Sequence, residues 1–148
     1  METENSHQFF SSYCFNKAWD LMEKLDRTPE EDEEMILLSH TSLWHWKQRD
    51  DCKNANLSIG FWQASRIYSI LGRAEDAKRY AQLCLRHSQE ETPFLLAYAF
   101  EALARAERVG GNGTMMAKYH AEAVRLAESV DDADDRKVLL DDLATITP

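Results

Sequence analysis

One stretch near the middle of the chain, residues 61–84, constrains the fold more than any other. Its first half carries a stripe of apolar and small residues spaced by three and four, as on one buried helical face: Phe61, Ala64, Ser65, Tyr68 and Leu71. Gly72 follows at once, where a helix commonly ends in a left-handed residue. A second stripe then contains Ala77, Ala81 and Cys84. The stretch therefore predicts two helices that join at a tight turn and approach closely through small side chains.

This order of residues resembles the tetratricopeptide repeat family, whose unit is a pair of antiparallel helices. The first stripe matches the large, medium, small and aromatic positions of the family's first helix. Leu71–Gly72 matches its turn, and the second stripe matches the packing positions of its second helix. Gln89 stands where the family usually has a closing proline. The resemblance is strongest over residues 58–130 and implies a stack of helical hairpins.

The hairpin pattern recurs once further along the chain. Moving the second stripe, together with Lys78, forward by forty residues reaches Ala117, Lys118, Ala121 and Val124. The helix expected before it, over residues 94–109, carries its own small-residue stripe and ends at Gly110–Gly111. We therefore predict two tandem hairpins, of which the second has a longer, glycine-rich turn.

Capping residues mark where several other helices begin. Thr28 and Glu31 flank Pro29 in the order of a capping box with proline at the first helical position. Three further residues are expected as N-caps of later helices: Asn56, Thr92 and Thr114. These signals, together with few glycines and prolines, favour helices throughout the chain.

The two ends of the chain differ in character. The first helix, expected over residues 6–24, has an unusually broad apolar arc that predicts contacts on more than one side. The last, over residues 132–146, is acidic, and its inward positions are expected to be Val138, Leu139, Leu143 and Ile146. A stacked array ends on a helix whose outer face tolerates water, and this segment suits that place.

The predicted fold is all-α, a short superhelix of antiparallel hairpins with about seven helices in one domain, residues 1–148. The expected hairpins cover residues 6–49, 57–88 and 93–130, and residues 132–146 form a capping helix.

Composition and charge exclude several classes of function. The formal net charge is −9, which phosphate backbones would repel, so nucleic-acid binding is not expected. Residues 23–34 and 131–148 hold most of the negative charge; they are either solvated segments or places for a basic partner. There is no apolar run of membrane-spanning length and no secretory signal. Three cysteines without metal-like spacing indicate free thiols, so we expect a cytoplasmic protein without a cofactor.

Candidate binding residues come first from the resemblance. First helices line the concave face of tetratricopeptide arrays, where partner segments usually dock. Residues that lie off the small-residue stripe of those helices are therefore the candidates: Trp62, Gln63, Arg66, Tyr98, Glu101 and Arg105. An ordinary solvated helix face remains the alternative for each of them.

A second candidate patch combines His40 and Trp44, which share a helix face. It would suit a peptide or small ligand, with core packing as the alternative. His40 and His45 lie about 140° apart around the same helix, so they are not expected to share a metal ion. No activated nucleophile, paired catalytic carboxylates or phosphate loop is indicated.

The function expected from these patterns is a non-catalytic, tetratricopeptide-like module that binds a protein or peptide partner in its groove. One alternative is a small-ligand sensor with an aromatic pocket made by Trp44, Trp46 and Trp62. A less favoured alternative is a metal-dependent helical enzyme that uses His40, His45, His87 or His120. Self-association as a homodimer, through the first or the last helix, stays open.

Overall fold

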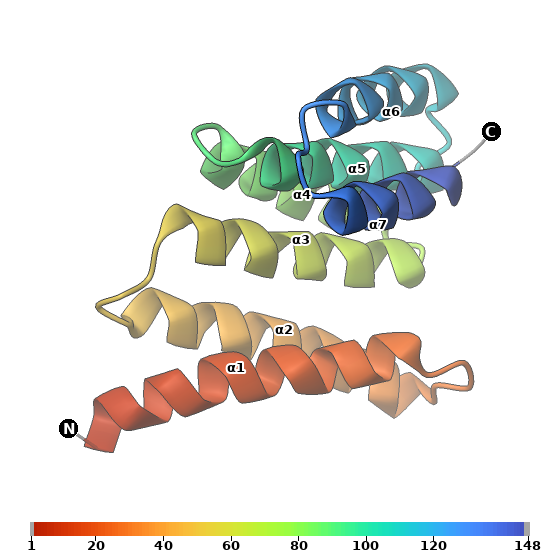
Figure 1. Cartoon of the computed structure of the whole chain (residues 1–148). Helices are drawn as coiled ribbons and strands as arrows, with labels where there is room; N and C mark the ends of the chain where they lie inside the picture. Colours follow the sequence, from red (N-terminus) through yellow and green to blue (C-terminus); the bar gives the residue numbers. More distant parts are fainter. Residues whose placement is uncertain (1, 147–148) are drawn as a thin grey trace.

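The protein is all-α and built from stacked helical hairpins, as the sequence predicts (Figure 1). A computed structural model describes residues 2–146. Over those residues it contains seven helices: α1 (Glu2–Glu23), α2 (Pro29–Gln48), α3 (Asn54–Ile70), α4 (Ala74–Ser88), α5 (Pro93–Val109), α6 (Gly113–Ala127) and α7 (Ala133–Ala144). Several limits differ from the expected ones; α1 begins at Glu2 rather than near Ser6, and α3 begins at Asn54 rather than at residue 57.

The helices pair in chain order, and each pair supports the next. The hairpins are α1–α2, α3–α4 and α5–α6. Helix α3 meets the first hairpin mainly through α2, α5 lies against both α3 and α4, and α7 lies against both α5 and α6. Figure 1 shows this progression from the red N-terminal pair to the blue α7. The first helices α1, α3 and α5 and the last helix α7 together form what we call the first-helix face.

Helix α5 has neighbours on nearly every side, which explains its composition. It contacts α3, α4, α6 and α7. Small side chains let these helices approach closely, and five alanines of α5 are at most 3% exposed: Ala97, Ala99, Ala102, Ala104 and Ala106. The predicted stripe of the central hairpin is buried too, including Ala64, Ser65, Ala77, Ala81 and Cys84.

Two glycines end the first helices of the second and third hairpins in the same way. Gly72 and Gly111 have φ of 74° and 79°, in the left-handed region. The N–H of Arg73 donates to the Tyr68 carbonyl at 2.9 Å, and that of Asn112 donates to the Glu107 carbonyl at 2.9 Å. These are Schellman closures, and they set the angle at which each second helix returns.

Replacing Gly72 with alanine should lower the free energy of unfolding by about 1–2 kcal/mol, because a Cβ is strained at a left-handed φ. No atom of residues 2–146 beyond its chain neighbours lies within 4 Å of that Cβ, so the cost is one of backbone conformation alone. Gly113→Ala is the matched control, since Gly113 has equal space and no positive φ. Urea unfolding checks both variants, and a similar loss in each would contradict the explanation.

The N-caps are partly as predicted. Thr28 and Glu31 form the expected capping box, and Thr92 accepts from the Leu95 N–H at 3.3 Å. Two predicted caps are wrong. Asn56 lies one turn inside α3, where its Oδ1 accepts from the Lys53 N–H, and Asn112 rather than Thr114 caps α6.

The register of the third hairpin also differs from the prediction. The two left-handed glycines are 39 residues apart, so the packing face of α6 is shifted by one position from the forty-residue match. Met116, Ala123 and Ala127 are buried, whereas the predicted Ala117 and Ala121 are exposed. In α7, Leu139 and Leu143 point inward, but Val138 is 53% exposed.

None of the helices in the described part of the chain carries an apolar stretch of the length that a bilayer requires.

Candidate functional site

The first-helix face contains an apolar hollow of about 340 Å³, which we call the aromatic hollow. Four helices supply its walls: Phe15 and Trp19 from α1, Ile59 and Trp62 from α3, Phe94, Leu95 and Tyr98 from α5, and Val138 and Asp142 from α7. Ser58 and Cys84 also line it. Ile59 and Val138 are 41% and 53% exposed, so the hollow is open to solvent at its rim. Concave, mostly apolar surface with a few polar groups is typical of binding sites.

The aromatic rings of the hollow hold one another in place. The Trp62 ring lies 5.7 Å from the Trp19 ring and 5.7 Å from the Tyr98 ring, the latter edge-to-face. Phe94 meets Tyr98 edge-to-face at 5.1 Å. Such contacts favour defined ring orientations, so the walls are largely formed before anything binds. Burial raises the pKa of the Cys84 thiol to about 11, so at neutral pH this side chain is an uncharged part of the lining.

A buried carboxylate lies next to the hollow. Glu101 of α5 is buried, and it accepts hydrogen bonds from three donors. These are Trp62 Nε1 at 2.9 Å, Arg66 Nη1 at 2.8 Å and Arg105 Nε at 3.0 Å. A carboxylate buried this deeply is tolerated because its oxygens are paired and hydrogen-bonded. We call Glu101 and these three donors the Glu101 network.

Helix α7 closes one side of this network. Asp142 Oδ2 accepts from the Tyr98 hydroxyl at 2.6 Å, and the Arg105 guanidinium donates to the Asp142 carbonyl and to Thr145 Oγ1. Burial, with the Asp142 hydrogen bond, raises the pKa of Tyr98, so its hydroxyl remains a donor. Burial lowers the pKa of Arg105, and the charge of Glu101 opposes that effect.

A smaller basic hollow of about 270 Å³ adjoins the network. Three arginines line it together with Ser69, Ile70 and Val109: Arg66, Arg105 and Arg108. The Arg66 guanidinium lies 5.6 Å from the Trp62 ring, so the aromatic and basic hollows meet along α3. Glu101 offsets part of this positive charge by pairing with Arg66 and Arg105, and Asp142 lies 3.6 Å from Arg66, whereas Arg108 forms no ion pair among the described residues.

The structure brings together five of the six residues predicted on first helices. Trp62 and Tyr98 line the aromatic hollow, and Arg66, Glu101 and Arg105 join them through the network. Glu101 does so as a buried group rather than as exposed groove surface.

The prediction of Gln63 as a groove residue is wrong. Its side chain is fully buried, and its Nε2 donates to the Phe15 carbonyl of α1 at 2.9 Å. Position 63 lies about 100° around α3 from Trp62, toward the neighbouring helix α1 rather than toward the open face. The Gln63 side chain can be buried there because the Phe15 carbonyl of α1 accepts its hydrogen bond, and the sequence does not predict that contact.

His40 and Trp44 do not form the predicted common patch. His40 Nε2 lies 2.9 Å from the Tyr68 hydroxyl, and its ring packs on Tyr80 of α4. Trp44 is 57% exposed and meets His7 and His45 instead. The two side chains start on one helix face but turn to different neighbours.

The pocket predicted from three tryptophans is also wrong, because they lie in different surroundings. Trp46 stacks under the Arg49 guanidinium at 3.9 Å and lines a separate small hollow, whereas Trp62 lines the aromatic hollow. Trp44 lies with His7 and His45, as described above.

The remaining histidines are dispersed. His45 Nδ1 lies 2.8 Å from His7 Nδ1, His87 contacts Asn54, and His120 contacts the Leu143 carbonyl. Over residues 2–146, no three histidine, cysteine or acidic side chains gather closely enough to hold a metal ion.

Protonation of His40 should destabilise the fold. Burial, assisted by Arg79, lowers its pKa below the ordinary value of 6.5. The unfolded chain therefore binds more protons than the folded one, so stability is lost as the pH falls below about 6.5. His40→Gln should make the fall in unfolding free energy between about pH 7 and about pH 5 shallower. Burial also lowers the pKa of His45 and His87, so some slope should remain; an unchanged slope would contradict the role of His40.

Several wall residues of the aromatic hollow were not among the predicted site residues: Phe15, Trp19, Ile59, Phe94, Leu95, Val138 and Asp142. The broad apolar arc of α1 could have indicated two of these residues, since Phe15 and Trp19 face the hollow rather than α2. The contribution of α7 could not be predicted from its sequence, because the position of α7 is set by its contacts with α5 and α6.

Comparison with known protein families, curated proteins and solved structures returns no match for this chain.

Proposed function

We propose that this protein is a non-catalytic, cytoplasmic module of the tetratricopeptide-like kind that binds a peptide segment of a protein partner on its first-helix face. The observation that carries this proposal is the aromatic hollow. Its walls come from four helices, its rings are mutually packed, and its rim is open. An apolar or aromatic side chain entering it would remove apolar surface of both partners from water.

The basic hollow suggests the second element of the recognised segment. Arg108 is exposed, whereas Arg66 and Arg105 are mostly occupied by Glu101. An acidic side chain a few residues from the apolar anchor would meet Arg108 at the edge of this hollow. We therefore propose a peptide with an apolar anchor and a nearby carboxylate. A phosphate backbone does not fit the net charge of −9.

The test is a selection from a display library of random peptides, followed by affinity measurements with fluorescently labelled peptides. Ile59→Arg places a charge at the exposed rim of the aromatic hollow and should weaken the selected peptides about tenfold or more. Leu140→Arg on α7, a residue that is 41% exposed like Ile59 and lies outside the lining of the aromatic hollow, is the matched control and should leave affinity unchanged. Peptides that bind the wild type and both variants equally would refute the proposal.

A small-ligand sensor remains the second candidate because of the size of the aromatic hollow. Its volume of about 340 Å³ falls within the range of small-molecule sites, roughly 300–1,000 Å³. Native mass spectrometry of the purified protein separates the two functions. A bound compound that is present in the wild type and missing in Ile59→Arg would favour the sensor.

A further inference from the structure

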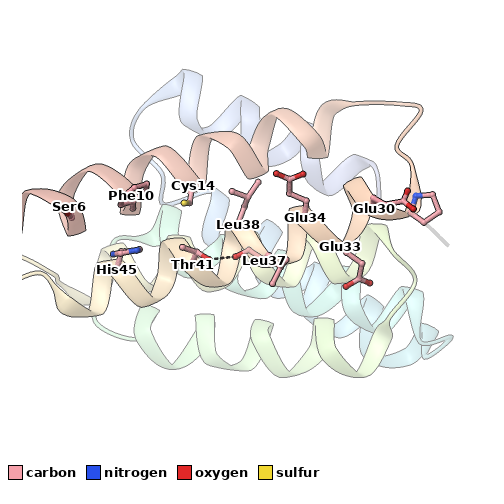
Figure 2. Close-up of a pocket in the computed structure, with 11 residues that line it drawn as sticks. Ser6, Phe10, Cys14, Glu30, Glu33, Glu34, Leu37, Leu38, Thr41 and His45 are labelled. Atoms are coloured by element: carbon pink, nitrogen blue, oxygen red, sulfur yellow. Dashed lines mark hydrogen bonds between the residues drawn. The ribbon is translucent and has the colours of Figure 1, made fainter. Parts of the chain in front are cut away.

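A second groove lies at the N-terminal end of the stack and has no lining residue in common with the aromatic hollow among the described residues. All of its lining residues belong to α1 or α2, and its volume is about 880 Å³. Figure 2 shows Phe10 and Cys14 on α1 and Leu37, Leu38 and Thr41 on α2 along this groove. We call it the end groove.

The end groove faces away from α3. On α2, the residues buried toward the rest of the stack include Ile36, Ser39 and Leu43. At 100° per residue, the groove residues Leu37 and Thr41 each lie about 160° around α2 from Ser39, and Glu34 lies about 160° from Ile36. This surface therefore lies where a preceding hairpin of the array would pack, and no described helix covers it.

The floor of the end groove is apolar and remains accessible to solvent. Phe10 is 41% exposed and Leu37 is 64% exposed, while Cys14 is buried beneath them. Apolar side chains gathered in a trough between two helices are typical of a surface that binds another chain.

The shape of the end groove suits a helix. Its α2 side is a stripe at spacings of three and four that runs from Glu30 to His45, about 22 Å along the axis. Within this chain, troughs between paired helices are filled by helices, since α5 lies against both α3 and α4 and α7 lies against both α5 and α6. An amphipathic helix laid into a groove is also a common mode of recognition.

The negative charge of the end groove favours a partner helix that carries positive charge. Glu30, Glu33 and Glu34 gather at one end of it, as Figure 2 shows, and His45 lies at the other. These three carboxylates form no ion pair among the described residues, whereas their neighbours Glu31 and Asp32 are paired with Lys24 and Arg27. Among the described residues, no lysine or arginine lines the groove.

We propose that the end groove binds an amphipathic basic helix of a partner protein. The apolar stripe of that helix packs on Phe10, Leu37 and Leu38, and its lysines or arginines meet Glu30, Glu33 and Glu34. Complementary charge at one end of the groove sets the direction in which the helix lies. This surface is separate from the first-helix face, so the protein could hold two partners at once.

The test uses two designed, fluorescently labelled helical peptides of about sixteen residues. Both carry leucines spaced by three and four; one has lysines on its flanks, and the other has glutamates in the same places. The lysine peptide should bind the wild type, more weakly as salt is raised. The variant Glu30→Lys/Glu33→Lys/Glu34→Lys should bind it about tenfold more weakly and should instead prefer the glutamate peptide. All three positions are exposed, and circular dichroism checks that the variant remains folded.

Two controls make the test specific. Ile59→Arg should leave binding of the lysine peptide unchanged, which separates this inference from the proposed function. Glu90→Lys, an exposed change in the loop between α4 and α5, should have little effect. Three results would overturn the inference: no binding of the lysine peptide, equal binding by the charge-reversed variant, or a homodimer in sedimentation velocity that Leu37→Glu abolishes. The last would mean that a second copy of this chain occupies the groove.

Discussion

Replacing Glu101 with alanine is expected to lower the free energy of unfolding by about 3–5 kcal/mol, the range for removing one partner of a buried ion pair. The substitution leaves the guanidinium groups of Arg66 and Arg105 without their shared anion, and it also leaves Trp62 Nε1 without an acceptor. The ion pairs of Glu101 should contribute more to the free energy of unfolding than surface ion pairs do, because they are largely buried. The side chain of Glu101 is 1% exposed, and those of Arg105 and Arg66 are 14% and 19% exposed.

Urea unfolding of the Glu101 variants gives the measurement. Glu101→Gln should fall between the wild type and Glu101→Ala, because the amide oxygen still accepts a hydrogen bond but carries no charge. Glu90→Ala is the control, since Glu90 is exposed and forms no ion pair within the described chain. A loss for Glu101→Ala no larger than that for Glu90→Ala would show that the network contributes little to stability.

Replacing Leu143 with alanine is expected to cost about 2–5 kcal/mol, because a fully buried leucine leaves a cavity when truncated. Leu143 is 1% exposed and packs in one core cluster with Leu139 and Ile146. These contacts seat α7 on α5 and α6 and hold Asp142 at the hydroxyl of Tyr98. Weakening them should therefore loosen one wall of the aromatic hollow as well.

Leu140→Ala is a matched control for this prediction, because Leu140 lies on the same helix and is 41% exposed. Its effect should stay within about 0.5 kcal/mol, as for most surface changes. Hydrogen exchange adds a local readout: amides of α7 should exchange faster in Leu143→Ala than in the wild type, with those of α2 changing less. Equal losses of stability in the two variants would contradict the assigned orientation of α7.

Capping residues and helical spacing predicted much of the architecture. These predictions failed where two possible helix starts or ends lay within one turn of each other. The box around Pro29 is complete within four residues, and it forms as expected. Asn56 and Thr114 are equally good capping residues by type, but Lys53 and Asn112 precede them at the actual helix starts. The one-residue shift of α6 has the same origin, since either Gly110 or Gly111 could have taken the left-handed conformation.

The candidate site was predicted in part, by the resemblance rather than by any chemical signal. Trp62, Arg66, Tyr98, Glu101 and Arg105 do meet, because first helices of successive hairpins lie side by side. The resemblance says nothing of how deeply each residue is buried. Gln63 is buried because it lies against α1. Glu101 is buried because its three hydrogen-bond donors and α7 surround it.

The sequence by itself determined the helices, their pairing and the small residues at which α3 and α4 touch, because each depends on spacings within a few turns of one helix. The tertiary structure alone decided the aromatic hollow, the Glu101 network and the end groove. Those features combine residues as far apart in the chain as Phe15 and Asp142, about 127 positions, and they depend on which neighbour each side chain meets. A helix face is a local property, whereas a binding surface is made by the packing of several faces.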